Sequence, residues 1–273
     1  MRVNHDRRRG ARATVRLTAL AAAVVCTACR VPDSPSRWHP NYAYLAGLPP
    51  VTFHYDHGVL AGSYPEGVET VTVGFEDVCA QLGHVCLCGA GGFKIAAKAV
   101  AALRGAGPPL ERGEFILISS HDHTVSDVIA FVLGCPRRRD AARSQYFVDA
   151  TLKPPRREYH YYIGYRPART AVHVVYRKHL LTGHAEMDRL WQIELAFERD
   201  PQTVSAADIA RYRRAMAKTV ADVLFERVPG LISVEAIPYE QFEQRLRDVR
   251  SDRLGDGRER SADAPGRQPA LGV

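Results

Sequence analysis

The chain has 273 residues, of which 46% are hydrophobic and 25% charged, a balance typical of a soluble globular protein. A chain of this length is more consistent with one domain of about 200 residues, flanked by terminal segments, than with two domains. The formal charge is +7, but the first 28 residues hold six arginines against one aspartate and account for five of those charges. The rest of the chain is nearly neutral, so its net charge gives no support for a nucleic-acid partner.

Residues 1–29 have the organisation of a signal peptide. An arginine-rich start precedes the apolar run 17–25, which is too short to span a bilayer but suits the hydrophobic region of a leader. Small residues precede Cys29, as in the lipobox of bacterial lipoproteins, so we predict export and a membrane anchor through lipidation of Cys29. Ordinary secretory cleavage, twin-arginine export suggested by residues 7–9, and a mistaken upstream start are the alternatives.

The rest of the chain predicts one α+β domain between two irregular segments. Five prolines among polar residues favour a tether over 30–50, and the charged segment 246–273 favours disorder. Apolar patterning predicts strands at 69–75, 114–120, 146–152, 158–165, 170–176 and 231–237. The same patterning predicts helices at 91–103, 124–134 and 205–227. The segment 180–197 fits either a helix or a strand. Mixed helices and mainly antiparallel strands indicate a single domain over 51–245.

The run from Gly83 to Gly89 carries the strongest chemical signal. It contains His84, Cys86 and Cys88, an imidazole and two thiols within five residues. These groups suit a soft metal ion or a reactive thiol, held on a glycine-flanked turn where the backbone can approach closely. In an exported protein the cysteines at 79, 86, 88 and 135 could instead form disulfides, although a bridge between Cys86 and Cys88 would be strained.

A second junction carries further candidates. His121, Asp122 and His123 precede the predicted helix 124–134, and Cys135 follows it. If this helix and the helix after Cys88 lie side by side, their N-termini meet, and helix N-termini lower the pKa of a thiol. The alternatives are a solvated His-x-His loop, a capping box over 124–127 and a buried Cys135. His54 and His57 are expected at the surface, with a role as further ligands as the alternative.

With these residues in place, the chain resembles the family of FmdE-like domains, which takes its name from a component of formylmethanofuran dehydrogenase. The resemblance covers about 75–238 and rests on two motifs. The first is the turn Gly83-His84-x-Cys86 before a helix; the second is a strand, an acidic turn and a helix that carries Asp127 and ends in Gly134-Cys135. The chain departs from the family at Leu87-Cys88, where Pro-Gly is usual, and at Thr124, where the family has a cysteine.

The resemblance implies a metal, typically zinc, bound by His84, Cys86 and Cys135, and Cys88 and His123 are further candidates that this chain adds. It does not extend to formylmethanofuran chemistry, because no iron–sulfur cysteine pattern is present. We therefore predict an exported FmdE-like protein that binds zinc or another transition metal.

One alternative is a metal- or thiol-dependent enzyme acting on a small substrate. Its nucleophile would be Cys86 or a metal-activated water, with Asp122 or His121 as general base. A second alternative is a disulfide-stabilised scaffold without catalysis. The substrate and a homodimeric state are left open by the sequence.

Overall fold

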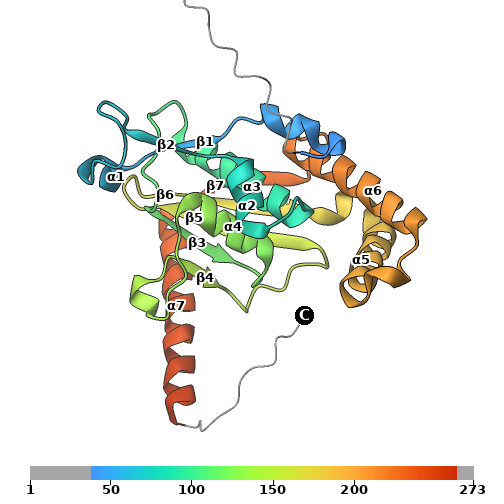
Figure 1. The fold of residues 1–273 in the computed structure, drawn as a ribbon. Coiled ribbons are helices and arrows are strands. Elements are labelled where there is room, and N and C mark those ends of the chain that lie inside the picture. The colour runs from blue at the N-terminus through green and yellow to red at the C-terminus, as the bar shows by residue number, and fades with distance from the viewer. Residues whose placement is uncertain (1–37, 263–273) are drawn as a thin grey trace, which may run out of the picture. The chain divides into compact units, whose positions relative to one another are not determined.

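The computed structural model describes residues 38–262, with side chains through residue 251, so the predicted leader and Cys29 lie outside the described residues. A five-stranded sheet in the order β4-β3-β5-β6-β7 lies at the centre of this part of the chain (Figure 1). Only the β3–β4 pair is parallel, which confirms the predicted α+β fold with a mainly antiparallel sheet. The strands are β3 (Phe115–Ser119), β4 (Tyr146–Val148), β5 (Glu158–Tyr165), β6 (Thr170–Arg177) and β7 (Ile232–Ile237).

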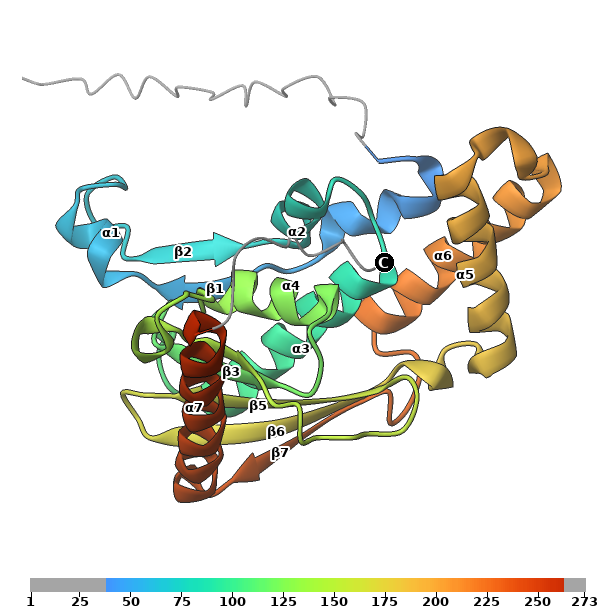
Figure 2. The same ribbon diagram turned by 90° about the horizontal axis from the view of Figure 1, so that it is seen from below.

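Helices cover the two faces of this sheet unequally. Helices α3 (Leu87–Arg104) and α4 (Thr124–Leu133) lie on one face, and α7 (Tyr239–Ala262) crosses the other (Figure 2). Side chains alternate between the faces along β5, so Tyr161 and Ile163 pack under α3 and α4 while Tyr162 packs under α7. Each face therefore has its own hydrophobic core, and the larger one lies under α3 and α4.

The N-termini of α3 and α4 point to the same end of the molecule, as predicted from the two junctions. The helices approach closely at Gly92, where an added Cβ would lie 2.6 Å from the Cβ of Val128 and 2.7 Å from the carbonyl oxygen of Val125. Helix α3 begins at Leu87 rather than at the predicted residue 91, with Cys86 as its N-cap. Cys88 therefore lies in the first turn of a helix and not in a loop.

The segment that precedes these helices is more ordered than predicted. Residues of the expected tether form the 3-10 helix η1 (Pro40–Gly47), in which Leu45 is buried and the Tyr44 hydroxyl donates to the carbonyl of Ala217. The domain therefore begins before residue 51, because apolar side chains between the prolines join the core. A two-stranded sheet and two short helices follow: β1 (Val51–His54), α1 (Asp56–Leu60), β2 (Thr70–Val73) and α2 (Phe75–Leu82).

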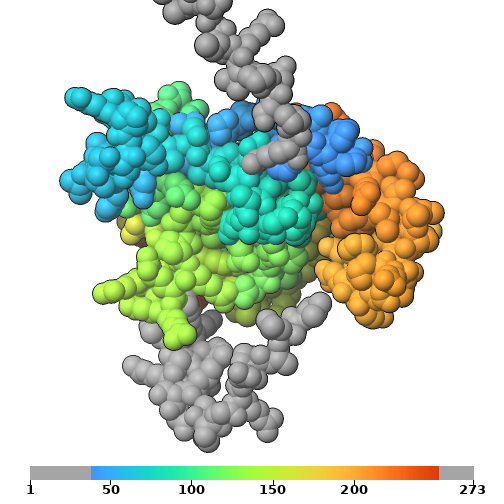
Figure 3. Space-filling model, in the orientation of Figure 1, coloured from blue at the N-terminus to red at the C-terminus, as the bar shows by residue number. Residues whose placement is uncertain are grey.

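The ambiguous segment 180–197 is helical. Helix α5 (Gly183–Arg199) and helix α6 (Ala206–Leu224) form a hairpin that stands at one side of the molecule, as the orange lobe of Figure 3 shows. Three short 3-10 helices complete the described chain: η2 (Ala141–Arg143), η3 (Lys178–Leu180) and η4 (Pro201–Thr203). Helix α7 continues to Ala262, so the segment from 246 to 262 is helical rather than disordered as predicted. Within residues 38–262, no helix has the length and apolar character needed to cross a membrane.

Candidate functional site

A pocket of about 450 Å³ opens where the N-termini of α3 and α4 meet the α5–α6 hairpin. Four of the predicted site residues line it: His84, Cys86, Cys88 and His123. The wall from α5 and α6 is largely apolar and includes Met187, Leu190, Trp191, Leu195 and Met216. The sequence motifs supply one half of this pocket, and the hairpin supplies the other.

The two thiols of the pocket are joined by a hydrogen bond that affects their pKa values in opposite directions. Cys86 caps α3, and its Sγ accepts a hydrogen bond from the backbone N–H of Gly89 at 3.3 Å. The Cys86 thiol donates to Cys88, and this bond together with burial raises the pKa of Cys86. The same hydrogen bond, with the charges of Lys178, His123 and His84, holds the pKa of Cys88 well below its usual range despite burial. Lys178 Nζ lies 4.0 Å from the Sγ of Cys88 and favours negative charge on this thiol.

The two histidines of the pocket present different nitrogens. His84 Nδ1 lies 2.9 Å from the carbonyl oxygen of Leu82. Because a carbonyl only accepts, Nδ1 carries the proton and Nε2 of neutral His84 keeps a free lone pair. His123 is the N-cap of α4, and its Nδ1 accepts the N–H of Val125 at 3.2 Å. Neutral His123 is thus protonated at Nε2 and is a hydrogen-bond donor there.

Two further groups by the thiols are buried. The Tyr176 hydroxyl is fully buried without a hydrogen-bond partner, and burial followed by the charge of Cys88 raises its pKa. Burial likewise raises the pKa of the Glu194 carboxyl on the opposite wall of the pocket.

His121 and Asp122, the predicted general bases, do not line this pocket. The Nδ1 of His121 lies 2.8 Å from the Ser120 hydroxyl, and burial lowers the pKa of its imidazole. Both carboxylate oxygens of Asp122 accept from Arg137 at 2.8 Å. An exposed ion pair of this kind is typical of a structural contact, so neither residue is placed to act on a molecule held at Cys88.

Cys135 is separated from the other predicted ligands. It is 1% exposed, burial raises the pKa of its thiol, and it borders a different pocket that Asp127 also lines. Helix α4 lies between His123 and Cys135, and its ten residues span about 15 Å. One ion cannot contact both side chains across that length, so the structure does not bring Cys135 into the expected ligand set.

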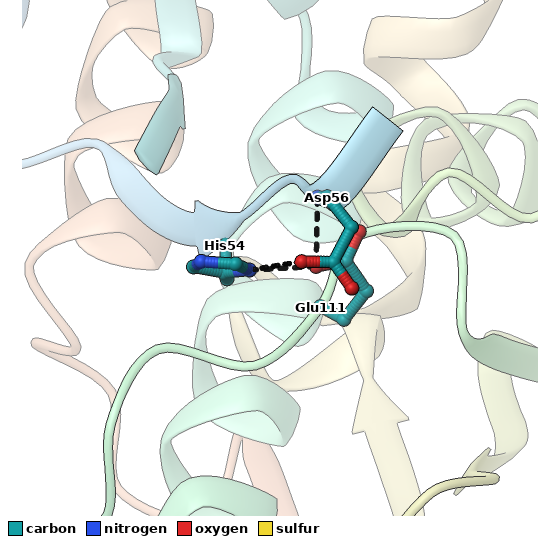
Figure 4. A group of neighbouring side chains, drawn as sticks. All are labelled: His54, Asp56 and Glu111. Atoms are coloured by element: carbon teal, nitrogen blue, oxygen red, sulfur yellow. Dashed lines mark hydrogen bonds and ion pairs between the residues drawn. The ribbon is translucent and has the colours of Figure 1, made fainter. Parts of the chain in front are cut away.

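The sequence motifs missed one cluster, formed by His54, Asp56 and Glu111 (Figure 4). Among residues 38–262 it is the only group of three such side chains whose ligand atoms all lie within 4.8 Å of one another. His54 Nδ1 lies 3.0 Å from Glu111 Oε2 and 3.1 Å from Asp56 Oδ1. Glu111 also accepts the backbone N–H of Asp56. His54 and Asp56 are neighbours in the sequence, but nothing in the sequence links them to Glu111.

The cluster is better explained by ion pairing than by a metal. The hydrogen bond to Glu111 and the neighbouring carboxylates raise the pKa of His54, against a smaller effect of burial. A protonated imidazole donates from Nδ1 and has no lone pair for a metal. The ion pairs of His54 link β1 to residue 111. They lie next to the backbone hydrogen bonds that His54 makes with Leu110 and Arg112.

Cys86, Cys88 and Cys135, the cysteines among the predicted ligands, form no disulfide bond. Comparisons with protein-family models, with curated proteins and with solved structures found no match for this chain. The resemblance to FmdE-like domains thus rests on the sequence motifs.

Proposed function

We propose that this protein, as an FmdE-like domain, binds a thiophilic transition metal, zinc in the first instance, through His84, Cys86 and Cys88. The observation that carries the proposal is the shared pocket: these three side chains line it, and the Nδ1–H of His84 is held by the Leu82 carbonyl. Histidine ligands in metal sites characteristically donate their second nitrogen in this way.

The donor set fits zinc chemically. Two thiolates and one imidazole are preferred zinc ligands, and the neighbours of Cys88 lower the pKa of its thiol. Binding would remove the proton that Cys86 shares with Cys88, as metal binding by thiols does in general. The donor atoms of these three residues do not lie within 4.8 Å of one another, so metal binding would require the exposed side chain of His84 to shift toward the thiols.

His123 takes a different role in this proposal. Its Nδ1 is occupied by the cap of α4, so it faces the pocket as an Nε2–H donor rather than as a ligand. It would then hydrogen-bond to a thiolate or to a group bound beside it.

The second candidate function is an enzyme acting on a small molecule at the same site. Three protein ligands leave a fourth zinc position open, which is the arrangement of catalytic rather than structural zinc sites. The pocket of about 450 Å³ beside the thiols could admit a substrate, and Lys178, His123 and Glu194 would be its polar contacts. A metal there would supply Lewis-acid activation of a bound oxygen.

Metal analysis of the purified full chain tests the first proposal. We expect Cys86→Ser/Cys88→Ser to bind one equivalent of zinc fewer than the parent, and His84→Ala to bind that equivalent at least tenfold more weakly. Cys135→Ala and His54→Ala are matched controls that should retain the metal, because both residues lie outside the pocket. A double cysteine variant that binds as many equivalents of zinc as the parent would overturn the proposal.

Cobalt substitution then separates the two candidates. A spectrum of the cobalt form that changes on adding small anions or thiols indicates an open position and supports the enzyme. A tetrahedral spectrum that stays unchanged indicates a closed site and contradicts it.

A further inference from the structure

A pair of histidines lies on the opposite face of the central sheet from the thiol pocket. His160 on β5 and His173 on β6 occupy diagonal positions, since Tyr162 is the register partner of His173 and Val175 that of His160. Their side chains share the face covered in part by α7, because Tyr162 and Ala171, also on that face, pack into the α7 core. His160 Nδ1 lies 3.0 Å from His173 Nε2.

A carboxylate fixes which nitrogen of His160 faces His173. His160 Nε2 lies 3.0 Å from Glu158 Oε1, and a carboxylate accepts, so the proton of neutral His160 is on Nε2. Its Nδ1 then presents a lone pair toward His173. A carboxylate that holds the remote N–H of a histidine is the usual second contact of a metal-bound imidazole.

The spacing of the two nitrogens also suits a metal ion. With zinc–nitrogen bonds of about 2.0–2.1 Å, two ligands of a tetrahedral ion lie about 3.3 Å apart. The observed separation of 3.0 Å is close to this value. An ion would replace the proton that now joins the rings, while His173 would move its own proton to Nδ1.

The surroundings hold the pair in place and leave it accessible. The ring of His173 stacks on Tyr162 with centroids 4.4 Å apart and an interplanar angle of 9°. The side chain of His160 is 23% exposed. Exposed Glu235 on β7 is the register partner of His173, but its carboxylate oxygens do not lie within 4.8 Å of both histidine nitrogens.

We propose that His160 Nδ1 and His173 Nε2 form a second site for a divalent transition cation such as zinc or copper, with solvent in its remaining positions. Glu158 is a positioning residue that holds His160 in the required tautomer. The site is independent of the thiol pocket and lies on the other face of the sheet.

Calorimetric titration of Zn²⁺ into the Cys86→Ser/Cys88→Ser chain tests this site without the thiols. We expect one equivalent to bind, with affinity reduced at least tenfold by His160→Ala and by His173→Ala. Glu158→Gln keeps the shape of the side chain but weakens its hydrogen bond to His160. We expect it to lower the zinc affinity about tenfold. Circular dichroism of each variant checks that the sheet is intact. If His173→Ala does not fold, His173→Gln is used in its place.

Copper provides a second readout. The electron spin-echo spectrum of bound Cu²⁺ should show two imidazoles in the parent and one in either histidine variant. Absence of zinc binding in the thiol-free chain would overturn the proposal. Binding that persists in the folded histidine variants, or that His54→Ala removes instead, would overturn it as well.

Discussion

The imidazole of His54 lies among carboxylates from three parts of the chain, Asp56, Glu69 and Glu111. The hydrogen bond to Glu111 is the largest cause of its raised pKa. A group whose pKa is raised on folding stabilises the fold below its unfolded pKa of about 6.5 and loses that effect as pH rises through the folded pKa. The ion pairs of His54 should therefore stabilise the protein at mildly acidic pH and not at alkaline pH.

Urea unfolding of the parent and of His54→Gln at several pH values measures this effect. We expect the variant to be less stable than the parent near pH 5.5, with the difference shrinking toward pH 9. A double-mutant cycle with Glu111→Gln isolates the pair, and its coupling energy should follow the same trend. A difference that does not depend on pH would contradict the assignment of a protonated His54.

The residues of the thiol pocket show what the sequence could and could not predict. The gathering of His84, Cys86, Cys88 and His123 followed from two helix junctions and is observed. Their roles could not be predicted, because the Leu82 carbonyl and the Val125 N–H, two backbone groups, fix the protonated nitrogen of each histidine. Cys135 was grouped with them by motif resemblance, but α4 holds it at the far end of the helix.

Among the elements, alternation located the long strands, and continuous apolar runs located β3 and α4. The short elements β1 and α2 were missed because four and eight residues carry too little periodicity. Helix α5 was ambiguous because only Met187 and Leu190 in it are buried. The half of the pocket wall that α5 and α6 supply could not be predicted for the same reason: no local pattern places this hairpin over the thiols.

The crossing of α3 and α4 gives a prediction about their packing. Gly92→Ala would place a Cβ within 2.7 Å of a backbone oxygen, which cannot be relieved by a side-chain rotation. We expect a loss of about 1–3 kcal/mol in the free energy of unfolding, even though alanine favours a helix by about 1 kcal/mol over glycine. Gly47→Ala is the control, since nothing lies within 4 Å of its added Cβ, and it should change stability by less than about 0.5 kcal/mol. Equal chemical-denaturation midpoints for the two variants would refute the close crossing.

Across the whole described domain, the sheet separates two cores, and the thiol pocket belongs to the face of α3 and α4. Phe242 on α7 is fully buried on the other face, where its ring lies against Gly164 of β5. Phe242→Ala should lower the free energy of unfolding by about 3–5 kcal/mol, the usual cost of emptying such a site. The zinc bound at the thiol pocket of the protein that remains folded should not change, because no residue of α7 lines this pocket.

Thermal unfolding and metal analysis of the same Phe242→Ala sample check both parts, with Leu60→Ala, 86% exposed, as the neutral control. If zinc is lost at temperatures where the variant is still folded, the two faces of the sheet are coupled, and the pocket cannot be treated as a property of α3, α4 and the α5–α6 hairpin alone.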